Sequence, residues 1–254
     1  MFATAAALHD IEKRYKTFTL GPLTLTIPAG SIVGLVGENG AGKTTTLKLL
    51  TGVIRPSAGR AELLGGNPAD PATRARIGVV FEDAYFYENL TAAQVGRSMA
   101  GIFGARWQPE AFAGYLTRFG LDPRQKIKEY SRGMRMKLSL ATALAHAPEL
   151  LVLDEPTSGL DPVVRGEILD LFLDFIQDET RSILMSSHIT TDLEQVADSI
   201  AYLHKGRLLF QEDKDELLAE YGLLRCAQAD LAKLPDGAAI HTERRAFGCE
   251  TLVR

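Results

Sequence analysis

Gly37-Glu38-Asn39-Gly40-Ala41-Gly42-Lys43-Thr44-Thr45 is a glycine-rich loop that identifies the core of this chain. The apolar run Ile32–Val36 precedes it and predicts a buried strand, and residues 45–50 predict a helix. Glycine allows backbone conformations that a Cβ would forbid, so successive amide N–H groups of this loop can converge on phosphate oxygens. The positive end of the helix adds to that attraction. We therefore expect a phosphate-binding loop rather than an ordinary glycine-rich turn.

Two side chains at the end of this loop extend the prediction. Lys43 is expected to contact the terminal phosphates of a nucleotide as a point charge. The Thr44 hydroxyl is expected to take a coordination position on Mg²⁺, an ion that prefers oxygen ligands and binds together with phosphates. The sequence therefore predicts a nucleotide site with Mg²⁺ as its metal ion.

The composition fits a folded protein with a full-sized core. The chain has 254 residues, of which 46% are hydrophobic, which suits one large domain or one domain with an appendage. The formal net charge is −4 and the basic residues are scattered, so we expect no nucleic-acid partner. Cys226 and Cys249 fit neither a disulfide framework nor a zinc spacing, and we expect reduced thiols in a cytosolic protein.

No stretch of the sequence has the pattern of a signal peptide or a membrane span. The first residues have no basic region, and their apolar stretch is interrupted by His9 and Asp10. No apolar run elsewhere reaches the length that a membrane-spanning helix needs. A role at a membrane would therefore require a partner.

The order of the predicted elements indicates an α/β fold. An alternating segment at 18–27 predicts antiparallel β structure before the loop, and residues 77–81 predict a buried strand. Helical patterns dominate residues 91–140, with Thr91 as the expected N-cap, while 150–153 and 182–188 each predict a strand that ends in polar residues. Strands separated by helices, with functional side chains at their carboxyl ends, favour a mainly parallel sheet with the site along that edge.

The chain is expected to form one large domain and a small appendage. The domain would cover residues 1–221 and contain a helical insertion at about 83–147. The appendage would cover residues 222–254 and ends in a β-like segment at 246–253. No function for the appendage follows from its residues.

Polar side chains follow two of the predicted strands at their carboxyl ends. Asp154 and Glu155 are adjacent, and adjacent side chains of an extended chain point to opposite sides, so we expect them to have different roles. One carboxylate would hold Mg²⁺ and the other would polarise the water that attacks the terminal phosphate. The alternative is that the pair caps the next turn. His188 is expected to hydrogen-bond the terminal phosphate, and its alternative is a structural role.

Several motifs, in their order and spacing, resemble those of the nucleotide-binding subunits of ATP-binding cassette transporters. The resemblance covers roughly residues 15–210 and implies a P-loop NTPase core with a mainly parallel sheet, an N-terminal antiparallel β subdomain and an inserted helical signature subdomain. Residues 37–44 resemble the Walker A motif, and residues 130–134 resemble the signature motif. Residues 150–155 resemble the Walker B motif with its following glutamate. Residues 158–161 resemble the D-loop, and His188 resembles the switch histidine.

The resemblance implies that the nucleotide is ATP and that two sites are shared across a head-to-tail dimer. In such a dimer Ser131 and Gly133 would contact the γ-phosphate of the ATP held by the other subunit, and a helix start is a suitable place for an anion. Tyr15 resembles the aromatic residue that stacks on adenine. Phe18 is the alternative for that stacking, and a core role for both aromatic residues also remains open.

The predicted site residues fall into three groups by role. The residues predicted to bind ATP are Tyr15, Gly37, Glu38, Asn39, Gly40, Ala41, Gly42, Lys43, Thr44, Thr45, Ser131, Gly133 and Asp161. The residues predicted to act in catalysis are Lys43, Glu155 and His188. The residues predicted to approach Mg²⁺ are Thr44, Glu82 and Asp154.

The sequence departs from the family's pattern at two places. Glu82 stands after the strand at 77–81 where the family usually has glutamine, and a carboxylate cannot donate a hydrogen bond. Arg132 replaces the first of two glycines in the signature motif, and Met134 replaces its glutamine. Arg132 is expected to supply positive charge that compensates for the amide lost at Met134. We expect these substitutions to tune coupling to a partner.

An acidic and aromatic segment at 82–88 has two open interpretations. Tyr85, Phe86 and Tyr87 either line a groove that receives a helix from a membrane subunit or pack the two subdomains together.

The resemblance predicts the separate ATPase subunit of a transporter, which hydrolyses ATP to ADP and phosphate. The expected partners are an identical or related ATPase subunit and a transmembrane permease, which would hold the protein in the cytoplasm at the inner face of the cell membrane. Residues 130–140 resemble those of exporters of small peptides or antimicrobial compounds. The alternatives are a soluble cassette ATPase acting on ribosomes or chromosomes and a regulatory nucleotide binder without turnover. A single cassette, the lack of sustained heptads and Glu155 argue against them.

Overall fold

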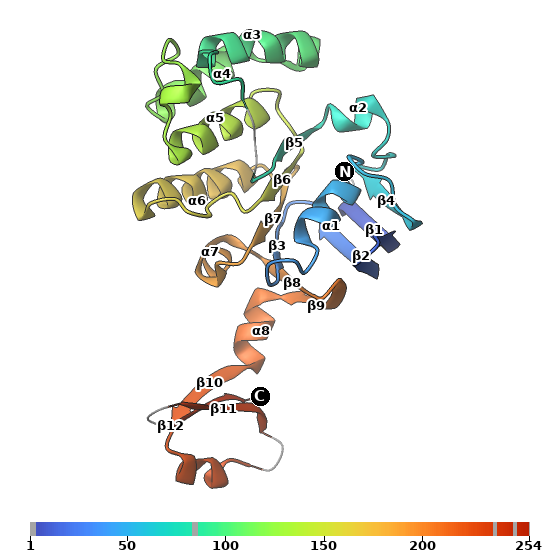
Figure 1. Ribbon diagram of the computed structural model, residues 1–254, viewed down its shortest axis with the longest axis vertical. Helices are drawn as coiled ribbons and strands as arrows, with labels where there is room; N and C mark the ends of the chain where they lie inside the picture. The colour runs from blue at the N-terminus through green and yellow to red at the C-terminus, as the bar shows by residue number, and fades with distance from the viewer. Residues whose placement is uncertain (1–3, 83–85, 236–237, 246–247, 254) are drawn as a thin grey trace. The chain divides into compact units, whose positions relative to one another are not determined.

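The structure is a computed structural model that describes residues 4–82, 86–235, 238–245 and 248–253 (Figure 1). The chain divides into two compact units, Met1–Gln211 and Glu212–Arg254. This division falls before residue 221, where the sequence suggested that the domain ends, so helix α8 (Lys214–Glu220) belongs to the second unit. Among the described residues, no helix is both long and apolar enough to cross a membrane.

A six-stranded sheet forms the centre of the first unit. The pairs β5–β6, β6–β7, β7–β3 and β3–β8 are parallel, which confirms the mainly parallel sheet predicted from the sequence. Every residue of β6 and β7 is buried, as expected for strands that are covered on both faces. In their order across the sheet, the strands are β5 (Ile77–Val80), β6 (Leu150–Asp154), β7 (Ser182–Ser187), β3 (Ile32–Val36), β8 (Ser199–His204) and β9 (Arg207–Asp213).

A smaller antiparallel sheet precedes the phosphate-binding loop, as the sequence predicted. It has the order β2 (Thr19–Pro28), β1 (Thr4–Arg14) and β4 (Ala58–Leu63). In β2, buried and less buried residues alternate over most of the strand, so one face of this sheet turns toward the core. The leucines and isoleucines of that face join helix α1 in one buried cluster with β3.

The helical insertion is present, and its described residues contain three α-helices. Thr91 caps the first of them, as predicted, and forms a capping box in which its hydroxyl accepts from the Gln94 N–H while the Gln94 side chain accepts from the Thr91 N–H. The helices of the first unit are α1 (Lys43–Leu50), α2 (Pro71–Arg74), α3 (Ala92–Phe103), α4 (Pro109–Arg118), α5 (Arg132–Leu144), α6 (Pro162–Ile176) and α7 (Thr190–Val196), with 3-10 turns η1 (Gly104–Arg106) and η2 (Ile127–Glu129).

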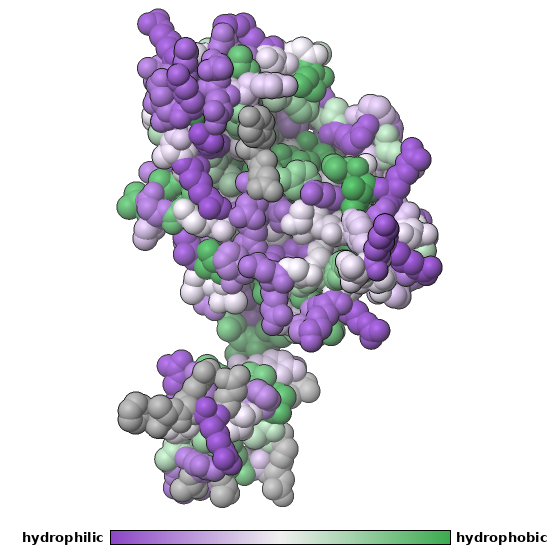
Figure 2. Space-filling view, viewed as in Figure 1, coloured by the Kyte–Doolittle hydropathy of each residue, from purple (hydrophilic) through white to green (hydrophobic). Residues whose placement is uncertain are grey.

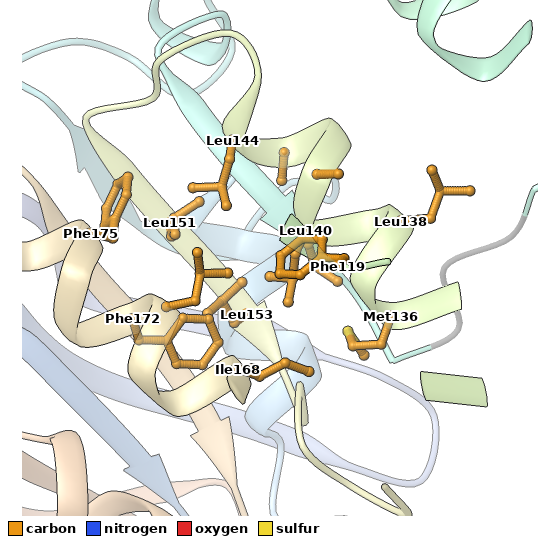
Figure 3. Close-up of a cluster of buried hydrophobic side chains, with 14 of the residues drawn as sticks. Phe119, Met136, Leu138, Leu140, Leu144, Leu151, Leu153, Ile168, Phe172 and Phe175 are labelled. Atoms are coloured by element: carbon orange, nitrogen blue, oxygen red, sulfur yellow. The ribbon is translucent and has the colours of Figure 1, made fainter. Parts of the chain in front are cut away.

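Helices cover both faces of the central sheet. Figure 1 shows α5 and α6 on one side of β6 and β7, and α1 with the antiparallel sheet on the other. Figure 3 shows how the first side is packed: Leu140 of α5, Phe172 of α6 and Leu153 of β6 meet in one cluster, and each is fully buried. The sheet is therefore held between two apolar layers, and the carboxyl ends of its strands remain free to carry polar groups.

The second unit contains a small antiparallel sheet of its own. Its strands have the order β10 (Gly222–Cys226), β12 (Gly248–Val253) and β11 (Ala239–Arg245), and it also contains α8 and the 3-10 helix η3 (Gln228–Lys233). Inside it, Cys249 and Thr251 are buried.

Candidate functional site

The phosphate-binding loop joins the carboxyl end of β3 to the start of α1. Gly42 precedes the helix with φ of 112°, a left-handed conformation that suits glycine. Gly37 has no room for a side chain, because a Cβ there would lie 2.3 Å from the Leu203 carbonyl oxygen. The Gly206 N–H donates to the Ala41 carbonyl at 2.9 Å, which fixes the loop to the turn after β8. Glycine is thus required by both the turn and the packing of this loop.

Lys43 is buried and folds back over its own loop. Its Nζ donates to the Gly37 carbonyl oxygen at 2.7 Å and lies 3.1 Å from Oε1 of Glu155. Only 6% of the Lys43 side chain and 8% of the Glu155 side chain are exposed, so each charge has the other as its nearby counter-ion. The structure therefore brings the predicted phosphate-binding cation and the predicted catalytic carboxylate into contact.

Asp154 is held by hydroxyl groups on both sides. Thr44 Oγ1 donates to its Oδ2 at 2.7 Å, and Ser186 Oγ donates to its Oδ1 at 2.6 Å. The carboxylate is buried, and its partners come from α1 and β7. A hydroxyl beside a carboxylate offers the oxygen ligands that Mg²⁺ prefers, so Thr44 and Asp154 fit the metal predicted for them.

Glu155 leaves the strand in a left-handed conformation, with φ of 50°. In an extended chain the side chains of Asp154 and Glu155 would point to opposite sides. This backbone is not extended, and the two carboxylates contact consecutive residues of one segment, Thr44 and Lys43. The Glu155 N–H donates to the Ser186 carbonyl and hydroxyl oxygens, each at 3.1 Å.

His188 completes this cluster from the end of β7. Its Nδ1 lies 2.7 Å from Oε2 of Glu155, and its backbone N–H donates to the same oxygen at 3.3 Å. Because a carboxylate only accepts hydrogen bonds, Nδ1 carries the proton in this contact. The side chain is 47% exposed, so the rest of the ring faces solvent at the edge of the cluster. Five predicted residues, Lys43, Thr44, Asp154, Glu155 and His188, thus meet at one end of the sheet.

Ser131 and Asp161 make only local hydrogen bonds among the described residues. Ser131 caps α5 by accepting from the Met134 N–H at 3.2 Å, and Asp161 caps α6 by accepting from the Val163 and Val164 N–H groups at 3.1 Å. Both residues are exposed. Gly133 faces Val164 of α6, where an added Cβ would lie 3.3 Å away. In one chain these three predicted residues therefore lie at the starts of α5 and α6, with Ser131 and Asp161 exposed and Gly133 partly buried, and they do not belong to the buried cluster.

Glu82 and Arg132, which both differ from the usual residues of the family, contact each other. Arg132 Nη2 lies 3.2 Å from Oε1 of Glu82, and the same guanidinium packs on Gly159, where an added Cβ would be 2.7 Å from Nη1. Glu82 and Arg132 also line a cavity of about 370 Å³ with Tyr130, whose phenol has a raised pKa because it is buried. Glu82, predicted to approach Mg²⁺, here neutralises Arg132, and Arg132 links the segment after β5 to the loop before α6.

The two aromatic candidates for adenine stacking have different surroundings. Phe18 packs against the loop, because added Cβ atoms at Gly42 and Gly206 would each lie 3.2 Å from its ring. Tyr15 is 46% exposed, with Lys13 Nζ 5.7 Å from the ring centroid. Phe18 is part of the packing beneath the loop, whereas the Tyr15 ring is available to a planar ligand.

Two residues that hold the site together, Ser186 and Asp192, belong to none of the sequence motifs. Ser186 bonds to Asp154 and to the backbone of Glu155, and the only signal for it was the polar end of the strand at 182–188. Asp192 is buried, accepts from Thr157 Oγ1 at 2.5 Å, and pairs with the Arg165 guanidinium. It joins the segment after Glu155 to α6 and α7. These partners are set by the sheet register and by helix packing, which the sequence does not display.

The aromatic segment at 82–88 is described only in part, since Tyr85 lies outside the described residues. Phe86 packs against the core cluster, and Tyr87 is 75% exposed. Nearby, a cavity of about 300 Å³ is lined by Phe81, Met99 and Phe103 among others. In Figure 2 hydrophobic residues gather between the α3 side and the α2 side of the unit, where this cavity lies.

Most of this chain is similar in sequence to known proteins. A family model described as ABC transporter matches residues 20–158, more than half of the chain. The chain is 38% identical over 230 residues to an ABC transporter ATP-binding protein of Synechocystis sp., and the match covers 85% of this chain and 65% of that protein, somewhat less than two thirds of its length. It is 35% identical over 248 residues to a fluoroquinolone export ATP-binding protein of Mycobacterium tuberculosis, covering 91% of this chain and 81% of that protein.

Solved structures show the same fold. A structure described as the ATP-binding subunit of an ABC transporter superposes with a TM-score of 0.75 at 28% identity, covering 85% of this chain and 92% of the other.

Proposed function

The chain belongs to the ABC transporter family, and we propose that it is the ATP-hydrolysing subunit of a transporter that works as a dimer with a separate membrane permease. ATP is its nucleotide, as in the ATP-binding proteins that it resembles. The observation that carries the proposal is the buried contact of Lys43 with Glu155, extended by His188 on one side and by the neighbouring Asp154 and Thr44 on the other.

In the structure Glu155 is paired with Lys43, so its carboxylate is not free to act on water. A phosphate bound at the loop would offer Lys43 a second anion and weaken that pairing. Glu155 would then accept the proton of the attacking water, while the His188 Nδ1–H holds its other oxygen in place. Phosphate binding and activation of the base are thereby linked through one lysine.

Thr44 and Asp154 are the residues proposed to hold Mg²⁺, which supplies charge neutralisation of the phosphates when bound. Ser186 holds the second oxygen of Asp154 and so fixes the carboxylate plane. Glu82 is proposed to contribute less directly to Mg²⁺ binding, because its carboxylate already neutralises Arg132.

Ser131, Gly133 and Asp161 are proposed to act on the ATP of a second subunit. The exposure of Ser131 and Asp161 supports this role, as does the place of all three residues at the starts of α5 and α6, where N–H groups attract anions. Tyr15 is proposed to stack on adenine, because its ring is exposed while Phe18 is packed under the loop.

The cavity beside Phe81 and Met99 is proposed to receive a helix of the permease. Its lining is mainly apolar, and the aromatic segment at 82–88 begins next to it. Docking there would hold the protein at the cytoplasmic face of the membrane and would connect the permease with Glu82. Export of small antimicrobial compounds is the proposed direction, supported by the likeness to the fluoroquinolone export protein.

The test is the Glu155→Gln variant with ATP and Mg²⁺. This change removes the base but keeps the side-chain volume, so ATP turnover should fall at least about a hundredfold, the lower end of what a general base contributes. Uncleaved ATP should then hold two chains together, and light scattering should report a dimer that is absent without nucleotide.

The matched control is Glu155→Gln combined with Lys43→Ala, which should neither bind ATP tightly nor dimerise. If Glu155→Gln stays monomeric while it binds ATP, a shared site is wrong. If Glu155→Gln turns over ATP at the unchanged rate, Glu155 is not the base. ATP turnover by the unchanged chain would exclude a regulatory nucleotide binder without turnover. Co-purification of the chain with ribosomes or chromosomes, rather than with a permease, would favour a soluble cassette ATPase.

A further inference from the structure

The two cysteines of the chain lie opposite each other in the second unit. Cys226 ends β10, Cys249 is the second residue of β12, and the two are register partners in the antiparallel β10–β12 pair. Both are free thiols. Their distance in the sequence hides this pairing, which arises because β12 lies between β10 and β11.

The two thiols belong to the same, more buried face of the small sheet. Cys249 and Thr251 are buried, and their partners Cys226 and Leu224 are partly buried. The opposite face carries Arg225 and Glu250, which are partners in the same register and whose side chains meet at 2.8 Å. Directly opposite residues of an antiparallel pair point to the same side, so Cys226 and Cys249 face each other.

The backbone separation at this position suits a disulfide. Directly opposite residues have Cα atoms about 4.5 or 5.5 Å apart, depending on their hydrogen bonding. Disulfides span Cα distances of about 4.4 to 6.8 Å, so both kinds of pair qualify. The strands also stay close here, because a Cβ on Gly248, which has φ of 141°, would lie 2.6 Å from the Cys226 carbonyl oxygen.

We propose that Cys226 and Cys249 are a redox modification site and form a reversible intramolecular disulfide with a low-molecular-weight disulfide as the oxidant. The Cys226 thiol is the more exposed, so it loses its proton and attacks the oxidant, which forms a mixed disulfide and releases one thiolate. The Cys249 thiol then loses its proton and attacks the Cys226 sulfur, which releases the second thiolate. The protein gives up two protons and two electrons, and the oxidant becomes two thiols.

The bond would close residues 226–249 into a loop that contains η3 and β11. Cross-linking the chain there restricts the unfolded state and prevents β10 from separating from β12. In a reducing compartment the pair stays as thiols, and an oxidising shift closes it. The small sheet of the second unit would thus exist in a dithiol form and in a disulfide-linked form in which β10 and β12 cannot separate.

The test treats the full chain with oxidised glutathione and measures its intact mass under non-reducing conditions. The expected product is a monomer whose mass is lower by two hydrogen atoms, with both thiols blocked to alkylation and both restored by dithiothreitol. Peptide mapping should recover one linked pair, Cys226 with Cys249. A stable glutathione adduct, a disulfide-linked dimer or two unreacted thiols in the folded chain would each overturn the proposal.

Two serine variants serve as controls. Cys249→Ser removes the resolving thiol, so glutathione should remain attached to Cys226. Cys226→Ser leaves only the buried Cys249, which should react at least about ten times more slowly than Cys226 until urea unfolds the chain. Equal rates for the two single thiols in folded protein would contradict the attack order. The test on the unchanged chain does not depend on either variant folding.

Discussion

At the scale of single residues, Glu155 is where the separate parts of the site meet. Lys43 reaches it from the loop, His188 from the end of β7, and Ser186 bonds to its backbone. Its left-handed backbone is a strained conformation for a residue with a side chain, and the surrounding hydrogen bonds hold it. A change in any one of these partners therefore alters the position of the carboxylate without removing it.

The contact between Glu82 and Arg132 gives the first prediction at this scale. Both side chains are about half exposed, so the pair contributes about 0.2–1 kcal/mol, and Glu82→Lys or Arg132→Glu should lower ATP turnover about 1.4- to fivefold. The double variant Glu82→Lys/Arg132→Glu restores an opposite pair and should recover at least half of the lost rate. Steady-state phosphate release measures all three.

The pair of Arg118 and Asp174, which is similarly exposed, is the control for this prediction. It joins α4 to α6 away from the predicted site, so Asp174→Lys should leave turnover unchanged. If the double variant of Glu82 and Arg132 is slower than both single variants, the ion pair is not what couples these positions.

At the scale of elements, the motifs located the ends of strands and helices well. The polar residues at the ends of β6 and β7 and the cap at Thr91 follow from local patterns, because the residue types that end a strand or begin a helix lie next to it in the sequence. What local patterns did not reveal are Ser186 as a partner of Asp154 and the buried Asp192, since these depend on strand register and helix packing. The pairing of Cys226 with Cys249 was hidden for the same reason.

The caps of α5 and α3 allow a matched prediction. Ser131 and Thr91 each accept a hydrogen bond from the first turn of a helix, so Ser131→Ala and Thr91→Ala should each cost about 1 kcal/mol in urea unfolding. Only Ser131 is proposed to contact the ATP of another subunit. In the Glu155→Gln background, Ser131→Ala should therefore raise the ATP concentration needed for dimerisation about tenfold, while Thr91→Ala should leave it nearly unchanged. Equal shifts for both would mean that Ser131 only stabilises its helix.

At the scale of the whole molecule, the contact between the helical insertion and the central sheet is sensitive to pH. His146 follows α5, is buried, stacks on Phe103 at 4.0 Å, and donates from Nε2 to the Ile77 carbonyl at 2.9 Å. Burial lowers its pKa. Glu149 precedes β6, and its hydrogen bonds from the Arg76 guanidinium lower its pKa as well.

Both shifts make the folded chain less stable in acid. An unfolded His146 takes up a proton below its ordinary pKa of about 6.5 while the folded one stays neutral, so the free energy of unfolding should fall as pH drops below that value. Glu149 adds a second loss at lower pH, as the carboxylate is protonated. In His146→Gln the fall in the free energy of unfolding that is caused by His146 should be smaller, because the glutamine amide can still donate to the Ile77 carbonyl but does not titrate. The urea midpoints of the unchanged chain and of His146→Gln, each at pH 7.5 and pH 5.5, measure this difference. An equal fall in midpoint for the two proteins would rule out His146 as the cause.

The place of each strand in the central sheet decides how easily its backbone hydrogen bonds open. β3 has β7 on one side and β8 on the other, whereas β5, which leads to Glu82, is an edge strand. Backbone amides of an interior strand exchange with deuterium only when neighbouring strands open, but an edge strand can detach alone. The phosphate-binding loop is therefore anchored where exchange should be slowest, and Glu82 where it should be faster. Strand β5, which leads to Glu82, can thus open locally while the phosphate-binding loop keeps its conformation.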